Sequence, residues 1–222
     1  MSAIIKSRSH WGLLIVSAGL LIGSAAAVYG ELMPFLRLGT TLDDKVAVLS
    51  AGVVVPGPSY RSKLLVLNDC NTALNSFEGN LLPIKERQSL LNNCKTVARL
   101  VLLEEPTYSL AWYIDALAAE GLGDTATINT SLVQSKRMNP RQEWLAESRA
   151  ILADRHIATL DDLAMASYHE DLALLVQSQR GARWVGRRYV SDPEFREVIT
   201  TIVEQLPVAE QRRFLNAVRS AS

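Results

Sequence analysis

The sequence is short of the residues that build several common kinds of functional site. Among its 222 residues there are two cysteines and three histidines. Two cysteines are too few for a disulfide-rich scaffold or for a closed zinc site built on three or four cysteines. An excess of one charge is lacking as well, since 23 basic residues balance 23 acidic ones. A chain without net charge has no overall electrostatic attraction to nucleic acid, so we expect no nucleic-acid partner.

Recognisable catalytic motifs are also missing. The sequence contains no HExxH, no GxSxG, no P-loop and no dinucleotide-binding glycine fingerprint. Its densest ionisable group, Tyr168 to Asp171, is consecutive, and neighbouring positions of a helix point about 100° apart. Such side chains do not converge on one ion, so we interpret the group as a solvated helix face. We therefore expect no enzyme activity, no catalytic residues, no metal site and no cofactor.

A long apolar run lies near the N-terminus. Residues 11–30 contain no acid or base, and twenty helical residues rise about 30 Å, the thickness of the hydrocarbon core of a bilayer. Trp11 and Tyr29 lie at the two ends, where amphipathic aromatic rings favour the headgroup level. Lys6 and Arg8 precede the run without an acid. The positive-inside rule then predicts a cytoplasmic tail over residues 1–10, a transmembrane helix over 11–30 and export of everything that follows.

A cleaved secretory signal is the alternative interpretation of this segment. Lys6 and Arg8 form an acceptable basic region, and Ala25 to Ala27 offer a small-residue cleavage site. The uncharged run is long for a signal, however, and apolar residues resume at Leu32, so we favour the uncleaved helix. Both interpretations place the bulk of the chain in one compartment. We expect the bacterial inner membrane, with the C-terminal domain in the periplasm.

Small residues recur within the apolar run. Gly19, Gly23 and Ala27 are spaced four apart and lie on one face of the expected helix. Such a stripe lets transmembrane helices approach closely. Small residues are also common in any membrane helix, and this plainer interpretation is the one we favour over helix packing.

The region between the apolar run and the first clear helix, residues 31–62, is predicted to be a linker. From Leu38 to Ser62 the helical period is lost, with β-branched clusters at 46–49 and 53–55 and the breaker Pro56-Gly57-Pro58-Ser59. We expect a short helix or strand here that leads into an extended spacer. From residue 63 onward apolar residues recur near a period of 3.6. They predict an all-α domain with helices near 63–78, 83–104, 107–121, 124–138, 141–153, 160–179, 192–205 and 208–219.

The stretch from Pro106 to Pro140 resembles a tetratricopeptide repeat. Its two prolines are 34 residues apart, which is the period of that helix–turn–helix unit. Trp112 lies where the repeat carries its tryptophan, and Gly123-Asp124 matches the turn between the two helices. Leu132 falls at the position of the large apolar residue in the second helix. Other positions depart from the pattern, namely Asp115, Ala119, Ile128 and Ser135.

The resemblance implies a fold and a role. A single helix pair cannot bury its own apolar face, so several units stack. We therefore expect a tetratricopeptide-like solenoid over residues 63–155 and a C-terminal helical bundle or cap over 156–222. Proteins of this family usually act as scaffolds that hold a segment of a partner in a concave groove.

The two cysteines lie on neighbouring predicted helices. Cys70 and Cys94 are each twelve residues from a turn near residue 82, so they face each other across an antiparallel helix pair. In an oxidising compartment we expect a structural disulfide. The alternative is two small buried thiols.

A basic and aromatic patch precedes the last helices. Residues 179–189 contain no acid, and Gly181 and Gly186 weaken a regular helix there. Guanidinium groups beside aromatic rings suit carboxylate, phosphate or sugar-acid groups and protein interfaces. The alternative is a loop whose arginines pair with Asp171, Asp192, Glu194 and Glu197 around a buried Trp184. The candidate partner or anionic-ligand residues are Arg180, Arg183, Trp184, Arg187, Arg188 and Tyr189.

These features together predict a single-pass scaffold, an accessory or assembly subunit of a cell-envelope complex that binds a protein partner. Polysaccharide synthesis or export is the pathway we favour, with an anionic polysaccharide as a further candidate partner. The alternative is a soluble periplasmic protein-binding module released by signal-peptide cleavage.

Overall fold

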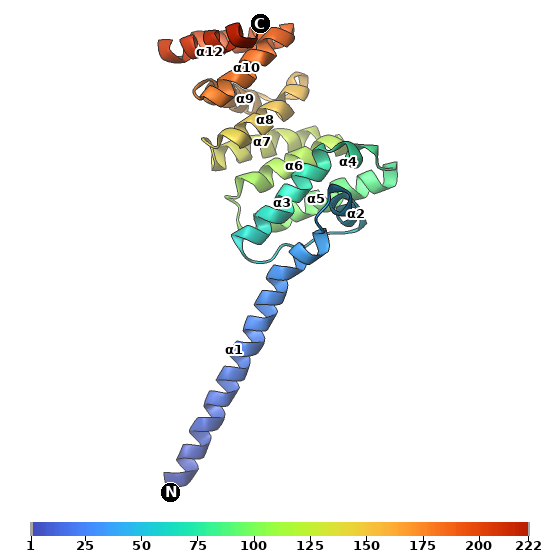
Figure 1. The fold of residues 1–222 in the computed structure, drawn as a ribbon, viewed down its shortest axis with the longest axis vertical. Coiled ribbons are helices and arrows are strands. Elements are labelled where there is room, and N and C mark those ends of the chain that lie inside the picture. The colour runs from blue at the N-terminus through green and yellow to red at the C-terminus, as the bar shows by residue number, and fades with distance from the viewer. Residues whose placement is uncertain (1, 222) are drawn as a thin grey trace. The chain divides into compact units, whose positions relative to one another are not determined.

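The computed structural model describes the backbone of residues 2–221 and the side chains of residues 11–221. Over this range the chain forms twelve α-helices and no strand, which confirms the all-α prediction (Figure 1). Contacts divide it into two compact units, residues 1–97 and 98–222, with the boundary inside α5. The helices are α1 (Ser2–Leu38), α2 (Leu42–Ala51), α3 (Tyr60–Asn75), α4 (Phe77–Leu81), α5 (Ile84–Glu104), α6 (Ser109–Leu122), α7 (Thr125–Met138), α8 (Glu143–Arg155), α9 (Asp162–Val176), α10 (Gln179–Ser191), α11 (Pro193–Glu204) and α12 (Val208–Ala221).

The first helix is continuous through the predicted membrane segment. Its part from Trp11 to Leu38 is long and apolar enough to cross a membrane, and side chains from Trp11 to Tyr29 are exposed. Gly19 and Gly23 have open space around them, so helix packing through this stripe stays a prediction. The tail prediction for residues 1–10 depends on side chains that lie outside the described residues.

Residues 31–62, predicted to be a linker, contain a short helix before a segment without regular secondary structure over 53–59, which is one of the two predicted alternatives. α1 continues to Leu38, and residues 42–51 form α2, which packs on α3. A capping box between Thr41 and Asp44 begins α2, because these side chains satisfy backbone N–H groups that lack a helical partner. Val46 and Leu49, one helical turn apart, are buried. Their burial stabilises the short helix, one of the two forms that the sequence allows here.

The end of α1 is fastened to the start of α3. The two carboxylate oxygens of Glu31 accept hydrogen bonds from the backbone N–H of Ser59, at 2.6 Å, and from its hydroxyl, at 2.5 Å. A Cβ added at Gly57 would lie 2.9 Å from the carbonyl oxygen of Gly30, so glycine permits this close approach. Glu31, the first acid after the apolar run, therefore has a structural role: it holds α1 to the start of α3.

The predicted disulfide joins α3 and α5. Cys70 and Cys94 are bonded, with their Cα atoms 5.7 Å apart, and both are fully buried. The bond closes across the helix pair that the sequence predicted. A disulfide is typical of an oxidising compartment.

In the second unit, α6 and α7 form a tightly packed helix pair. Gly123 ends α6 in the left-handed conformation, with φ of 72°, which costs glycine little because it has no Cβ. Asp124 then caps α7 by accepting a hydrogen bond from the backbone N–H of Thr127. The Gly-Asp turn thus explains the reversal of the chain, while its assignment to a tetratricopeptide unit stays a prediction.

Candidate functional site

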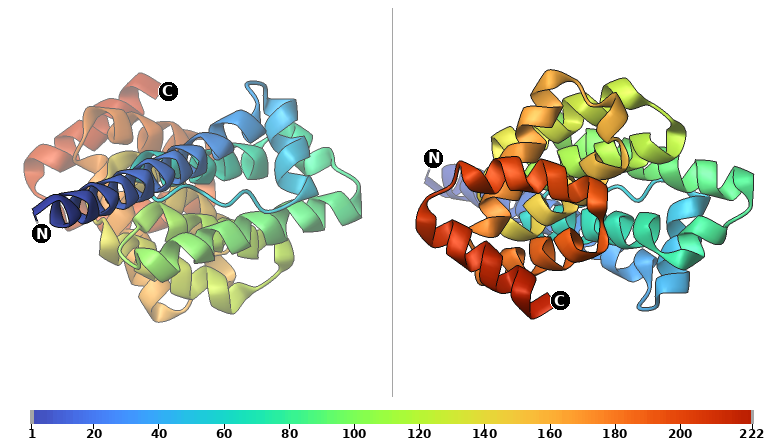
Figure 2. Two further views of the ribbon diagram at one scale, coloured as in Figure 1. Left: turned by 90° about the horizontal axis from the view of Figure 1, so that it is seen from below. Right: turned by 90° about the horizontal axis from the view of Figure 1, so that it is seen from above.

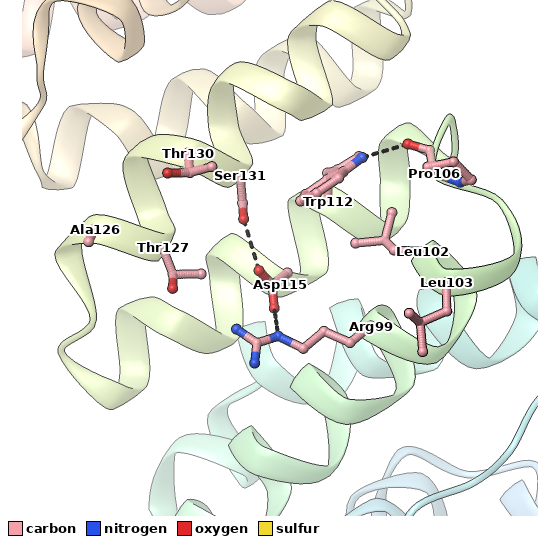
Figure 3. Close-up of a pocket in the computed structure, with 10 residues that line it drawn as sticks. All are labelled: Arg99, Leu102, Leu103, Pro106, Trp112, Asp115, Ala126, Thr127, Thr130 and Ser131. Carbon is pink, nitrogen blue, oxygen red and sulfur yellow. Dashed lines mark hydrogen bonds and ion pairs between the residues drawn. The ribbon is translucent and has the colours of Figure 1, made fainter.

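A groove is formed by α6, α7 and the end of α5. Its volume is about 760 Å³, in the range of pockets that bind ligands. Apolar side chains of α5 and α6 line one part of it, and hydroxyl groups of α7 line another (Figure 3). The lining residues are Arg99, Leu102, Leu103, Pro106, Trp112, Asp115, Ala126, Thr127, Thr130 and Ser131.

The polar part of the groove is organised by Asp115. Its buried carboxylate accepts a hydrogen bond from Nε of Arg99 at 3.1 Å and another from the hydroxyl of Ser131 at 2.8 Å (Figure 3). Within the described residues, the two terminal nitrogens of the Arg99 guanidinium have no hydrogen-bond partner. Asp115 thereby orients a half-exposed guanidinium that still has donors to offer.

The apolar part of the groove is also ordered. Nε1 of Trp112 donates a hydrogen bond to the carbonyl oxygen of Pro106 at 2.8 Å, which fixes the plane of the indole ring. Leu103 is 82% exposed, so the same groove presents a large aliphatic side chain to solvent. The arrangement suits a ligand that carries an apolar side chain and an acidic group close together.

This site was only partly visible in the sequence. The repeat pattern predicts Trp112 and the Gly-Asp turn, whereas Asp115 is a departure from that pattern. Arg99 and Ser131 carried no signal of their own, because their role arises when α5, α6 and α7 pack together. An acid in the middle of an otherwise apolar helix was the one available indication.

The predicted basic and aromatic patch has a different local structure from the one expected. Residues 179–191 form α10, a regular helix that begins with Ser178 as its N-cap. The glycines do not break it. A Cβ at Gly181 would lie 2.3 Å from the carbonyl oxygen of Leu175, and a Cβ at Gly186 would lie 2.9 Å from the backbone of Ala217. Both glycines therefore serve close backbone contacts rather than a loop.

The helix distributes the patch residues over different faces. Arg188 pairs with Asp154 and Asp192, and it also lies 4.8 Å from the ring of Phe195. Arg180 pairs with Glu147 at 3.1 Å. Arg183 and Arg187 are exposed and, within the described residues, have no ion-pair partner. Two arginines of the patch therefore form ion pairs within the fold, and the other two are exposed and available to a ligand.

The two aromatic residues of the patch pack inward. Trp184 makes an edge-to-face contact with Phe195 at 6.3 Å between ring centroids, and Tyr189 makes one with Phe214 at 5.3 Å. Both rings are partly exposed. Such contacts hold α10 to α11 and α12.

Of the four acids expected to neutralise the patch, the structure pairs one with it. Asp192 contacts Arg188, whereas Asp171 is buried in a separate cluster with Arg149 and Lys136. In the described residues, neither Glu194 nor Glu197 forms an ion pair with the patch. The sequence did not indicate Glu147 and Asp154, because they reach α10 from α8, more than thirty residues earlier.

The histidine-containing group is spread over its helix. His169 and Glu170 are exposed, whereas Asp171 is buried. Burial of part of its ring lowers the pKa of His169 below 6.5. Among the described residues, no group of three or more histidine, cysteine or acidic side chains is arranged to hold a metal ion.

Comparison of the chain with protein-family models, with curated proteins and with solved structures finds no match.

Proposed function

We propose that this chain is a membrane-anchored helical scaffold, and that its groove between α5, α6 and α7 holds a segment of a protein partner. The observation that carries the proposal is the ordered pairing of Asp115 with Arg99 beside exposed apolar side chains. A buried acid fixes a cation at the edge of an apolar surface, and arginine and large apolar contacts are the groups that hold acidic or amphipathic peptide segments. The proposed role is binding, as an accessory or assembly subunit of a cell-envelope complex.

Three features support the placement of this scaffold at a membrane. α1 is long and apolar enough to span a bilayer. Lys6 and Arg8 precede the apolar run without an acid, which favours a cytoplasmic N-terminus and a periplasmic C-terminal domain. Cys70 and Cys94 are bonded, as is common outside the cytoplasm. We accordingly propose the bacterial inner membrane as the location.

The scaffold is proposed to be tetratricopeptide-like. The support is the resemblance of residues 106–140 to that repeat, together with the packed pair of α6 and α7 around Gly123. In this proposal Asp115 replaces a usual leucine and adds a polar contact to the groove. Polysaccharide synthesis or export is the pathway we favour, by analogy with other helical-repeat scaffolds of the envelope.

Peptide binding to the full chain in detergent tests the groove. Arrays of short peptides in which acidic and apolar residues are varied would identify the preferred pattern. We expect binding to require an acidic residue next to a large apolar one. Replacing Arg99 by glutamate is expected to lower the affinity for such peptides at least about tenfold, because one charge-assisted contact is lost.

Matched controls make this experiment specific. Arg137 is exposed on α7 and does not line the groove, so Arg137→Glu changes the charge equally while leaving binding intact. Leu103→Asp should lower the affinity for the same peptides, because it removes the apolar contact. Equal binding of all peptides, or equal effects of Arg99→Glu and Arg137→Glu, would refute the proposed function.

A further inference from the structure

Positive charge is concentrated on two helices near the C-terminus. α10 carries four arginines and no acid, and α12 carries three arginines and one acid, Glu210. Seven of the 23 basic residues therefore lie in two helices, although the whole chain has no net charge. The helices are separated in sequence by α11 but pack side by side (Figure 2).

A cleft opens where these two helices run together. Its volume is about 420 Å³, and it is lined by three arginines, Arg183 from α10 and Arg212 and Arg213 from α12. Among the described residues, no acidic side chain lines it. Like charges do not gather in one cleft for stability, because their repulsion opposes folding. An anionic ligand would relieve that repulsion.

Small residues create the space. Ala182, Ala209 and Ala217 form the apolar part of the lining, and Gly186 allows α10 to approach the backbone of α12. The backbones are therefore close while the side chains between them are short. Long arginine side chains at the edge then surround a hollow that contains no large apolar side chain.

The arginines differ in how they are held. One terminal nitrogen of Arg213 donates hydrogen bonds to the carbonyl oxygens of Val176 and Gln177, at 3.3 and 2.7 Å, so this side chain is fixed in place. Arg183 and Arg212 are exposed and have no hydrogen-bond or ion-pair partner within the described residues. One preoriented guanidinium and two available ones thus face the same cleft.

The remaining polar lining indicates the class of ligand. Gln179, Asn216 and Ser220 add amide and hydroxyl groups, which donate to and accept from hydroxyl groups. An amphipathic peptide would require large apolar contacts, and a lipid would require a place for its acyl chains. Neither is offered by a lining whose largest apolar residue is alanine. A ligand rich in both carboxylate and hydroxyl groups fits best.

We propose that the cleft between α10 and α12 binds an acidic oligosaccharide, with its sugar-acid carboxylates contacting Arg183, Arg212 and Arg213. Guanidinium groups bind carboxylates through paired hydrogen bonds. The amide and hydroxyl side chains would contact the sugar hydroxyls. This site is formed by different helices from the peptide groove, so its occupancy is independent of the proposed function.

Calorimetric titration of the full chain in nanodiscs of zwitterionic lipid tests the proposal. The probe is an oligogalacturonate, and the matched neutral probe is a maltooligosaccharide of the same length. We expect the acidic probe to bind, with an affinity that falls as salt is raised, and the neutral probe not to bind. Arg183→Ala combined with Arg212→Ala should weaken binding at least about tenfold.

Two further variants separate the cleft from general positive charge. Arg61→Ala with Arg137→Ala removes the same charge from two exposed positions that have no ion-pair partner among the described residues, and it should leave binding intact. Ala209→Leu, at an exposed position, fills the cleft while keeping every arginine and should abolish binding. Unchanged binding in Ala209→Leu would overturn the assignment to the cleft.

The ligand class is tested by two competing probes. An oligoglutamate carries carboxylates without hydroxyls, and phosphatidylglycerol vesicles carry the anionic group on a lipid. We expect both to bind at least about tenfold more weakly than the oligogalacturonate. Equal or tighter binding of the peptide or of the vesicles, or no binding of the oligogalacturonate, would overturn the proposal.

Discussion

Arg149 and Asp171 form a buried two-pronged ion pair that joins α8 to α9. Nε and Nη2 of the guanidinium donate to the carboxylate oxygens at 2.7 and 2.8 Å, and both side chains are only 2% exposed. Nζ of Lys136 on α7 lies 3.0 Å from the same carboxylate. One acid therefore holds three consecutive helices together.

Removal of that acid should destabilise the fold strongly. In Asp171→Ala two buried cations lose their partner, and breaking a buried pair in this way costs about 3–5 kcal/mol. Urea unfolding followed by circular dichroism measures the change. Glu170→Gln is the control, because Glu170 is exposed and lies 3.7 Å from Lys136, and it should change stability by less than about 0.5 kcal/mol. Similar losses in the two variants would contradict this account.

The disulfide should contribute substantially to the stability of the first unit. Cys70 and Cys94 are 24 residues apart. Closing a loop of that size lowers the entropy of the unfolded chain, which stabilises the folded state by about 3 kcal/mol. Cys70→Ala with Cys94→Ala should lower the unfolding free energy accordingly. Alkylation before and after reduction, in protein from native cells, reports whether the bond forms there. Free thiols in freshly isolated protein would contradict the predicted oxidising compartment.

The proposed orientation of the chain depends on the charges before the apolar run, Lys6 and Arg8. Alkaline phosphatase fused after the C-terminus should be active, because that enzyme matures only outside the cytoplasm, and a fluorescent protein fused there should stay dark. Reversing Lys6 and Arg8 to glutamate should reduce phosphatase activity. The intact mass of the mature protein distinguishes a retained helix from a cleaved signal. A mature start near Val28 would establish the cleaved form.

Acidification should destabilise the second unit through His169. Burial lowers its folded pKa below the ordinary value of 6.5, so the unfolded chain binds a proton more readily than the folded one. The contribution of neutral His169 to the unfolding free energy is therefore fully present above about pH 6.5, and it is lost as the pH drops below that value. His169→Gln should flatten this part of the profile, measured as the urea midpoint between pH 7.5 and 5.5. A parallel profile in the variant would contradict the assignment.

Helix positions were the most predictable part of this molecule. Apolar spacing and breakers placed α5, α7 and α11 within a few residues of their observed ends, since those helices bury one regular face. The sequence does not decide between helix and strand for α2, because its two buried residues, Val46 and Leu49, lie among β-branched neighbours. α10 was missed because glycine is a poor helix former in isolation, while Gly181 and Gly186 are required by backbone contacts visible only after packing.

The sites were less predictable, because they combine residues distant in sequence. The repeat pattern located Trp112 but not Arg99, which reaches Asp115 from the preceding helix. The basic patch located Arg183 but not its neighbours Arg212 and Arg213, which come from α12. No local pattern encodes such pairs, and they become apparent when helices pack.

The central claim is that the groove beside Asp115 holds a protein segment, and photocrosslinking tests it most directly. One variant carries a photoreactive amino acid at Leu103 in the groove. The control variant carries it at Leu163, which is 69% exposed on α9 and lies outside the groove. Native membranes that contain either variant are irradiated. We predict one discrete adduct from position 103, none from position 163, and loss of that adduct in Arg99→Glu. Mass spectrometry should map the adduct to a partner segment with an acidic residue beside an apolar one. Identical adducts from the two positions, or none from position 103, would contradict the account.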